Sequence, residues 1–302
     1  MGYASTDFKR LPACTDAVVN SPRYDDILEI KLHELLNQPL VHAGLAPFLA
    51  ALITAELFQR IRLSGLAIIA GFALTIYLAS SFSFDPLTAT RKIILLGLVC
   101  AALGLLLDLL RLSWFGALLP ILGAAAAVWV ALSIFRNQPP EIVLLWGAGC
   151  AAYVAILVWG MDTMESDSLR SATAGAALGL GTGGAALIAS SALLGKFGLA
   201  LGSAALAIVL IQMVFNQTFS TGRVFTLPLA FIAGTTGCLA VLNGPLPWYA
   251  LPLLAAIPII AFLMPLPRMS LLMQSLLLAI PSFALAAGAV FITWQSVGKP
   301  AF

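Results

Sequence analysis

The sequence predicts an all-α bundle of membrane-spanning helices, and three observations carry that prediction. Of the 302 residues, 61% are apolar, whereas a soluble domain has about 45–50%. Only 9% are charged, against about 25% in soluble domains. The apolar residues also fall in continuous runs near 20 residues, the length that crosses a hydrocarbon core of about 30 Å. This composition excludes an ordinary soluble enzyme.

Residues 1–38 form a polar tail that holds ten of the 28 charged residues. Within the tail, Ser21 and Pro22 are typical of a helix start, and Pro39 ends the apolar periodicity. We therefore expect an amphipathic helix over 22–37. Its polar side mixes acidic and basic residues, unlike a lipid-binding helix. It packs against the protein's own loops or provides a docking face for a partner protein.

Ten apolar runs follow the tail, separated by short polar breaks. Because the runs are continuously apolar rather than alternating, helices are favoured over a barrel. The expected spans are 42–58, 63–82, 92–111, 114–135, 140–161, 171–194, 197–216, 224–243, 247–267 and 272–295. Residues 39–161 would form a first five-helix half and residues 162–302 a second.

The orientation follows from the basic residues beside the spans. With the N-terminus inside, Arg91, Lys92 and Arg136 lie in the cytoplasm, while Arg170, Arg223 and Arg268 lie outside. The balance is nearly even, but Lys9 and Arg10 in the tail favour two cytoplasmic termini. The tail also lacks the apolar run of a secretory signal. We expect the inner, or plasma, membrane of a bacterium.

An offset of 134 residues relates the two halves. It carries each of the first five spans onto one of the last five, and it carries Trp114 onto Trp248. Five spans is an odd number, so the second half would lie inverted relative to the first, as in many transporters. The alternative is ten evenly spaced helices without common ancestry.

A length near 300 residues, ten spans and a 5+5 inverted repeat make residues 42–295 similar to the drug/metabolite transporter superfamily. The resemblance is architectural and has no residue-level motif behind it. It implies transport of a small molecule and assigns no functional residue. The polar tail is not part of what it implies.

Ionisable residues inside spans are costly and are therefore the first candidates for function. Odd-numbered spans end on one side, which places Glu56, Asp108, Arg111 and Asp162 in one charged layer at the outer interface, with Arg60 and Arg62 nearby. Glu56 with Arg60, and Asp108 with Arg111, share a helical face. The layer either anchors helix ends by ion pairing or forms the mouth of a path for a cationic or zwitterionic substrate.

No ionisable group is expected near the bilayer midplane, so a binding site there would use neutral side chains. The candidates are Thr182, Gln212, Thr235 and Thr236. Gln212 is the foremost, because its amide offers both donors and an acceptor. The same amide can instead bond a neighbouring helix.

Glycines at spacings of four, Gly175, Gly179 and Gly183, mark the sixth span. Small residues at this spacing let helix backbones approach closely. The alternative is a locally unwound segment that binds a ligand.

The predicted function is an integral membrane transporter of a small, neutral or weakly charged solute, in contact with the lipid bilayer. The alternative is a non-catalytic membrane subunit or assembly factor of a larger complex. An enzyme acting on a lipid carrier is a third reading that the charged layer alone would support, and we expect no enzyme. Two histidines and four dispersed cysteines predict no metal site or cofactor, and a net charge of +2 predicts no nucleic-acid partner.

Overall fold

The computed structural model describes residues 41–58, 64–79, 88–110, 113–136, 138–217, 220–267 and 269–298, which belong to one compact unit, Pro39–Phe302. Within these ranges every regular element is a helix and there is no strand. The all-α prediction is confirmed. The predicted helix 22–37 lies outside the described residues, and so do Arg60, Arg62 and Arg111.

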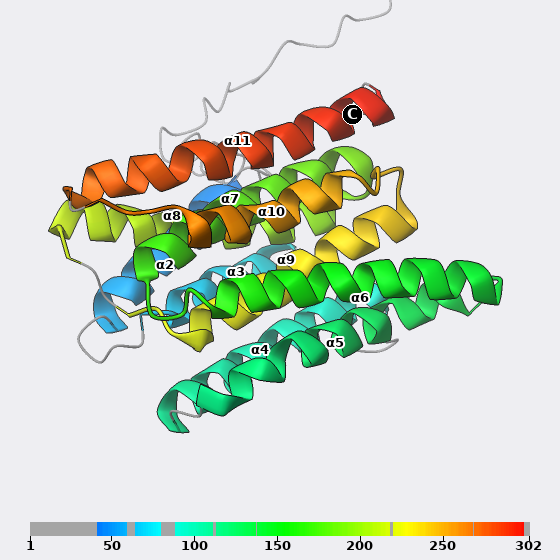
Figure 1. Ribbon diagram of the computed structural model, residues 1–302, viewed down its shortest axis with the longest axis horizontal. Helices are drawn as coiled ribbons and strands as arrows, with labels where there is room; N and C mark the ends of the chain where they lie inside the picture. The colour runs from blue at the N-terminus through cyan, green and yellow to red at the C-terminus, as the bar shows by residue number, and fades with distance from the viewer. Residues whose placement is uncertain are drawn as a thin grey trace, which may run out of the picture. The chain divides into compact units, whose positions relative to one another are not determined.

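The helices follow one another along the chain with short connections (Figure 1). They are η1 (Val41–Leu45), α2 (Ala46–Phe58), α3 (Leu66–Ala79), α4 (Ala89–Leu110), η3 (Ser113–Ala117), α5 (Leu119–Phe135), α6 (Pro140–Asp162), α7 (Ser168–Ala189), α8 (Ala192–Phe215), α9 (Arg223–Asn243), α10 (Ala250–Leu263) and α11 (Leu271–Val297).

Among the described residues, seven helical segments are long and apolar enough to cross a membrane: η1 with α2, then α4, α6, α7, α8, α9 and α11. The three shorter apolar helices are α3, α5 and α10. Proline accounts for much of the shortening of α10, because Pro247 precedes its start and Pro265 follows its end. The structure supports a membrane-embedded helical protein, while ten complete spans remain a prediction.

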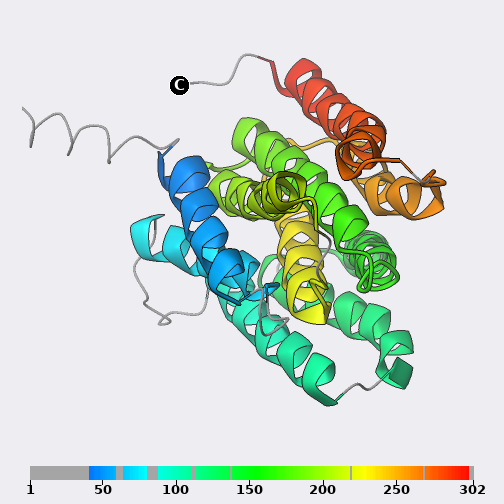
Figure 2. The same cartoon turned by 90° about the vertical axis from the view of Figure 1, so that its left-hand side faces the viewer.

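Three consecutive helices, α7, α8 and α9, form the buried centre of the bundle (Figure 2). In their most apolar windows, 78%, 72% and 94% of residues are buried, compared with 22% for η1 with α2 and 28% for α11. Helix α9 packs against α3, α4, α5, α6, α7 and α8. The three central helices therefore all belong to the second half of the chain, and the two halves do not contribute equally to the buried centre.

Glycines bring α7 and α8 together at the centre. A Cβ on Gly183 would lie 2.4 Å from the Leu199 amide nitrogen, and one on Gly179 would lie 2.4 Å from that of Gly202. Only hydrogen side chains permit this approach. Helix α7 is continuous from Ser168 to Ala189, so close packing is the correct reading of the glycine pattern and the unwound segment is wrong.

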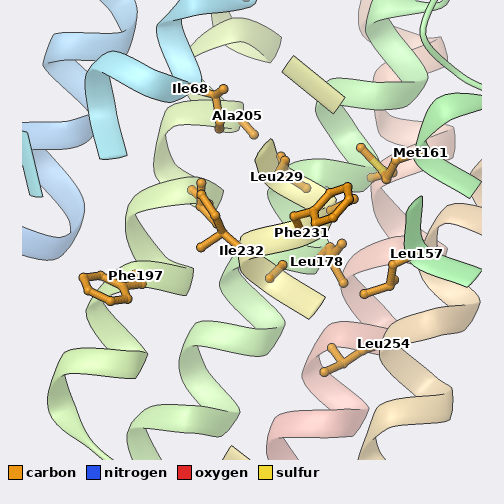
Figure 3. Close-up of a cluster of buried hydrophobic side chains, with 14 of the residues drawn as sticks. Ile68, Leu157, Met161, Leu178, Phe197, Ala205, Leu229, Phe231, Ile232 and Leu254 are labelled. Carbon is orange, nitrogen blue, oxygen red and sulfur yellow. The ribbon is translucent and has the colours of Figure 1, made fainter. Parts of the chain in front are cut away.

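Large apolar side chains fill the space around these helices (Figure 3). Phe197 on α8 is one of the side chains labelled there, and its ring meets that of Phe72 on α3 edge to face, with centroids 5.4 Å apart. Leu157 and Met161 of α6 lie near Leu178 of α7 in the same view and are fully buried. Burial of such side chains fixes the positions of the polar groups described below.

Some of the helix–helix contacts that an inverted repeat requires are present in the structure, and others are not matched between the two halves. Helices α2 and α3 pack together as α7 and α8 do, and α5 and α6 pack together as α10 and α11 do. The counterpart helices α3 and α8 touch, as do α4 and α9. However, α7 packs extensively on α11, and α2 has no comparable contact with α6. The repeat therefore remains a prediction.

Candidate functional site

The first candidate site is built at the start of α9, where Asp108 of α4 supplies the helix cap. Its Oδ1 accepts a hydrogen bond from the Arg223 amide at 3.0 Å, and its Oδ2 accepts one from the Val224 amide at 3.0 Å. The first amides of a helix have no partner within the helix. Because the preceding residue is Gly222, which has no side chain to accept those bonds, a carboxylate 115 residues earlier in the chain takes that role.

Two glycines leave room for this carboxylate. Gly222 has φ +67°, and a Cβ on it would lie 2.3 Å from Asp108 Oδ2. A Cβ on Gly104, one turn before Asp108, would lie 2.6 Å from the Arg223 carbonyl oxygen. The contact between α4 and α9 at this end therefore requires glycine on both sides.

The side chain of Arg223 joins α9 to the end of α6. Its Nε lies 2.8 Å from Asp162 Oδ1 and 2.6 Å from Glu165 Oε2. The guanidinium is nearly buried, with 7% of the side chain exposed, while the Glu165 side chain is 36% exposed. Gly116 of η3 lies over the pair, since a Cβ there would be 2.8 Å from Asp162 Oδ2.

Negative charge predominates among these four ionisable side chains. Burial raises the pKa of Glu165, and this effect outweighs the lowering by the Arg223 guanidinium; the nearby Asp162 and Asp108 raise it further. In the described part of the chain, no group of three His, Cys, Asp or Glu side chains is arranged to hold a metal ion. The arrangement is an ion-paired clamp that joins α4, α6 and α9.

Of the predicted charged layer, the structure brings Asp108 and Asp162 together, while Arg111 lies outside the described residues. Asp108 and Asp162 converge on Arg223. Glu56 is exposed on α2. Arg170 pairs with Asp167 at 3.0 Å and also donates to the Ala261 carbonyl. Sequence reasoning placed Arg223 on the same side but did not assign it as the partner of Asp162, because spacing along one helix cannot reveal pairs between helices.

The second candidate site is a group of buried hydroxyls on α6, α7 and α9. The Tyr153 and Thr182 hydroxyls lie close enough to interact with each other, but neither makes a hydrogen bond of good geometry within the described residues, and neither does the Thr236 hydroxyl. Tyr153 lies beside Thr182 and Cys238, and a Cβ on Gly237 would lie 3.1 Å from its hydroxyl oxygen. Thr235 differs, because its hydroxyl donates to the Phe231 carbonyl at 2.6 Å.

Depth separates Gln212 from the other predicted polar residues. Helices α7 and α9 begin at the same end of the bundle, where Ser171 Oγ lies 3.0 Å from Thr221 Oγ1. Thr182 and Thr236 stand at similar distances from those starts, whereas Gln212 lies one turn before the end of α8. Gln212 is therefore near the Arg223 end rather than level with the threonines. Both atoms of its amide group lack a partner in the described structure.

Sequence reasoning missed Tyr153 and the burial of Lys92. Tyr153 sits in an apolar run, where a single phenol reads as a core aromatic. Lys92, expected at the cytoplasmic start of the span 92–111, is 9% exposed in the first turn of α4. Its Nζ donates to the Trp129 carbonyl at 3.0 Å and lies 5.0 Å from the centroid of that ring. A Trp on a neighbouring span was the available indication of a cation–π partner.

Comparison with known proteins adds no relative. No protein-family model matches the chain, and no curated protein matches it. The fold itself defines the class: the protein is a membrane-embedded helical bundle with several helices long enough to span a bilayer.

Proposed function

We propose that the protein is a membrane transporter of a small, neutral or weakly charged solute, which binds among Tyr153, Thr182 and Thr236. The observation that supports this most strongly is the presence of three buried hydroxyls on three helices at the centre, of which only Tyr153 and Thr182 approach each other and none makes a hydrogen bond of good geometry within the described residues. A buried polar group without a partner costs about 1–3 kcal/mol. A solute that bonds to these hydroxyls would recover that free energy, and this supports the proposed binding site.

Gln212 provides a further polar point along the proposed path. Its unpaired amide lies nearer the end of the bundle that is closed by Asp108, Asp162 and Arg223. A solute leaving the hydroxyls toward that end would pass the amide before reaching the ion pairs. The proposed site thus keeps Thr182, Gln212 and Thr236, with Thr235 turned to its own helix.

We propose ten spans in an inverted 5+5 arrangement, with both termini in the cytoplasm of a bacterial cell. The contacts between α3 and α8 and between α4 and α9 support it. So do two edge-to-face aromatic pairs before α5 and α10. Trp114 meets Phe115 with ring centroids 5.3 Å apart, and 134 residues later Trp248 meets Tyr249 at 5.9 Å.

Ligand-induced thermal stabilisation tests the site. The purified protein is screened against neutral metabolites, and a solute that binds only the folded form raises the melting temperature. Thr182→Val, Thr236→Val and Tyr153→Phe should each remove most of the shift. Thr293→Val on α11 is the matched control, because that threonine is buried but its hydroxyl bonds the Ala289 carbonyl. Equal shifts in all four variants would refute the proposed site.

The second candidate is a non-catalytic subunit of a membrane complex. It is favoured by the tight packing of the centre, where Gln212, Thr235 and Thr236 have no exposed surface. Mass measurement of the particle extracted in mild detergent separates the two functions. Stoichiometric companion chains would support the subunit, and one or two copies of this chain alone would support the transporter.

A further inference from the structure

Two cysteines from different helices face each other beside the hydroxyl site. The Cys238 thiol on α9 donates to the Cys150 carbonyl of α6, with the sulfur 3.8 Å from the oxygen. The two thiols also lie close enough to interact with each other. Both cysteines are free, and each is 2% exposed. They form a buried pair of thiols that joins two separate helices.

The register of α6 and α9 places the two cysteines opposite each other. The helices run antiparallel, since the end of α6 meets the start of α9 at the ion-paired clamp. A Cβ on Gly234 would lie 3.0 Å from Val154 Cγ2, so these two residues face each other at close range. Cys238 follows Gly234 by about one turn, and Cys150 precedes Val154 by about one turn. The two thiols therefore lie at the same level.

This arrangement suits a disulfide. The bond joins Cα atoms about 4.4–6.8 Å apart, so it forms between cysteines that already face each other. Cys150 and Cys238 have interacting thiols. Cys100 on α4 is the comparison within the chain, because it is 3% exposed and has no interacting thiol among the described residues. The geometry separates one cysteine pair from a cysteine of equal burial.

The surroundings of the pair select the kind of oxidant. Cys150 lines an apolar groove of about 710 Å³ between α6 and α10, and the lining contains no charged residue. A charged, water-soluble thiol reagent such as glutathione is costly to bring into such a surface. A quinone dissolved in the bilayer has the matching polarity and accepts two electrons. It would approach the pair from the side of Cys150.

We propose that Cys150 and Cys238 are a redox-active pair, which a lipid-soluble quinone oxidises to a disulfide between α6 and α9. Both S–H bonds break and one S–S bond forms. Two protons and two electrons pass to the quinone, which leaves as the hydroquinone. Tyr153 lies one turn after Cys150, so the bond fixes the phenol against α9. The proposal goes beyond transport, because it concerns the covalent state of the bundle.

A count of free thiols tests the proposal on the full chain in phosphatidylcholine vesicles. Cys14→Ser removes the cysteine of the tail and leaves Cys100, Cys150 and Cys238. The oxidant is duroquinone, whose four methyl groups block addition of a thiol to the ring. The chain is then denatured with a maleimide–polyethylene glycol, which adds a fixed mass to each free thiol. We expect three adducts before oxidation and one afterwards, with one quinone reduced per chain, and dithiothreitol should restore all three.

Cleavage at methionine identifies the bond. Met161, Met164 and Met213 lie between the two cysteines in the sequence. Cyanogen bromide therefore places them on the fragments 2–161 and 214–264, which should migrate together without reductant and separately with it.

Two matched variants assign the partners. Cys150→Ala should abolish the link between the fragments and leave its two remaining thiols free after oxidation. Cys100→Ala also removes a buried thiol, but it should leave the link intact. If Cys150→Ala does not fold, Cys238→Ala removes the same bond from the α9 side.

Three results would overturn the inference. One is an unchanged number of adducts after the vesicle-bound chain has met the quinone. Another is loss of the Cys100 thiol at the same rate as the other two, which would show general oxidation. The third is a fragment link that persists in Cys150→Ala. These readouts are independent of the proposed function, because none of them requires a transported solute.

Discussion

Asp108 caps a helix that begins at Arg223, so the last turn of α4 holds the first turn of α9. Both carboxylate oxygens accept backbone hydrogen bonds at 3.0 Å, from the amides of Arg223 and Val224. The Arg223 side chain then turns to Asp162 and Glu165 beyond α6. Asp108 and Arg223, together with Asp162 and Glu165, thereby hold the ends of α4, α6 and α9 together.

Asp108→Ala should lower the free energy of unfolding by about 1–3 kcal/mol, because two helix-terminal amides lose their acceptor. Asp108→Asn should cost less, since one oxygen remains to accept a bond. Thermal unfolding in detergent, followed by circular dichroism, measures both. Glu141→Ala at an exposed position on α6 is the control, and an equal loss there would show that the cap is unimportant.

Gly222→Ala should destabilise the protein more than Gly298→Ala. Both glycines have positive φ, +67° and +80°, with ψ of −177° and −163°, so both variants carry the strain of about 1–3 kcal/mol of a backbone conformation that is essentially restricted to glycine. Only at Gly222 would the new Cβ also strike the Asp108 carboxylate, at 2.3 Å, while Gly298 faces open space. The difference in melting temperature between the two variants isolates the clash. Equal melting temperatures would contradict the described contact.

Glu165 should make stability depend on pH. Its pKa is raised by burial in the folded protein, so the folded state binds a proton more readily than the unfolded state does. The stabilising effect of this proton is present below the ordinary pKa and is lost as pH rises through the folded value. Melting temperature should therefore fall as pH increases from about 4.5 toward neutrality.

Glu165→Gln removes the titrating group and keeps an acceptor for Arg223. Its melting temperature should vary less over the same pH range than that of the native chain. The readout is the difference between the two curves, which cancels the other carboxylates. If the two curves stay parallel, Glu165 is not the source of the dependence.

Gly183→Ala should strongly destabilise the bundle or prevent folding, because the Cβ would lie 2.4 Å from the Leu199 amide nitrogen. Backbone atoms cannot move aside as a flexible side chain can. Gly149→Ala is the matched control: it is also a glycine within a helix, it has open space around it, and it should gain up to about 1 kcal/mol from helix propensity. Yield after gel filtration and melting temperature compare them. Similar behaviour of the two variants would mean that α7 and α8 are not in backbone contact.

The helical class and the close approach of α7 could be predicted because both depend on local pattern. Runs of apolar residues and glycines at spacings of four carry that information along one helix. The pairing of Asp162 with Arg223 could not be predicted in this way, since it joins residues 61 positions apart. Helix length was also not predicted correctly from the apolar pattern. The apolar run 247–267 predicts a full span, but Pro247 and Pro265 limit α10 to Ala250–Leu263.

The same reasoning explains why Gln212 was expected too deep and why Tyr153 was overlooked. Depth in a bundle depends on where each helix begins, and α8 ends only one turn after Gln212. A tyrosine within an apolar run has the composition of a core residue. Its position beside Thr182 and Cys238 becomes visible only when the neighbouring helices α7 and α9 are placed.

The buried centre also has a consequence for synthesis. Ribosomes make the chain from the N-terminus at about 5–20 residues per second, and Asp108 precedes its partner amide by 115 residues. The carboxylate therefore waits about 6–23 s for the start of α9 to be translated. Helices α2 through α6 are all made before α7, α8 and α9, the three helices that bury them, so lipid or a chaperone must cover their inner faces until then. The nascent first half therefore depends on its surroundings.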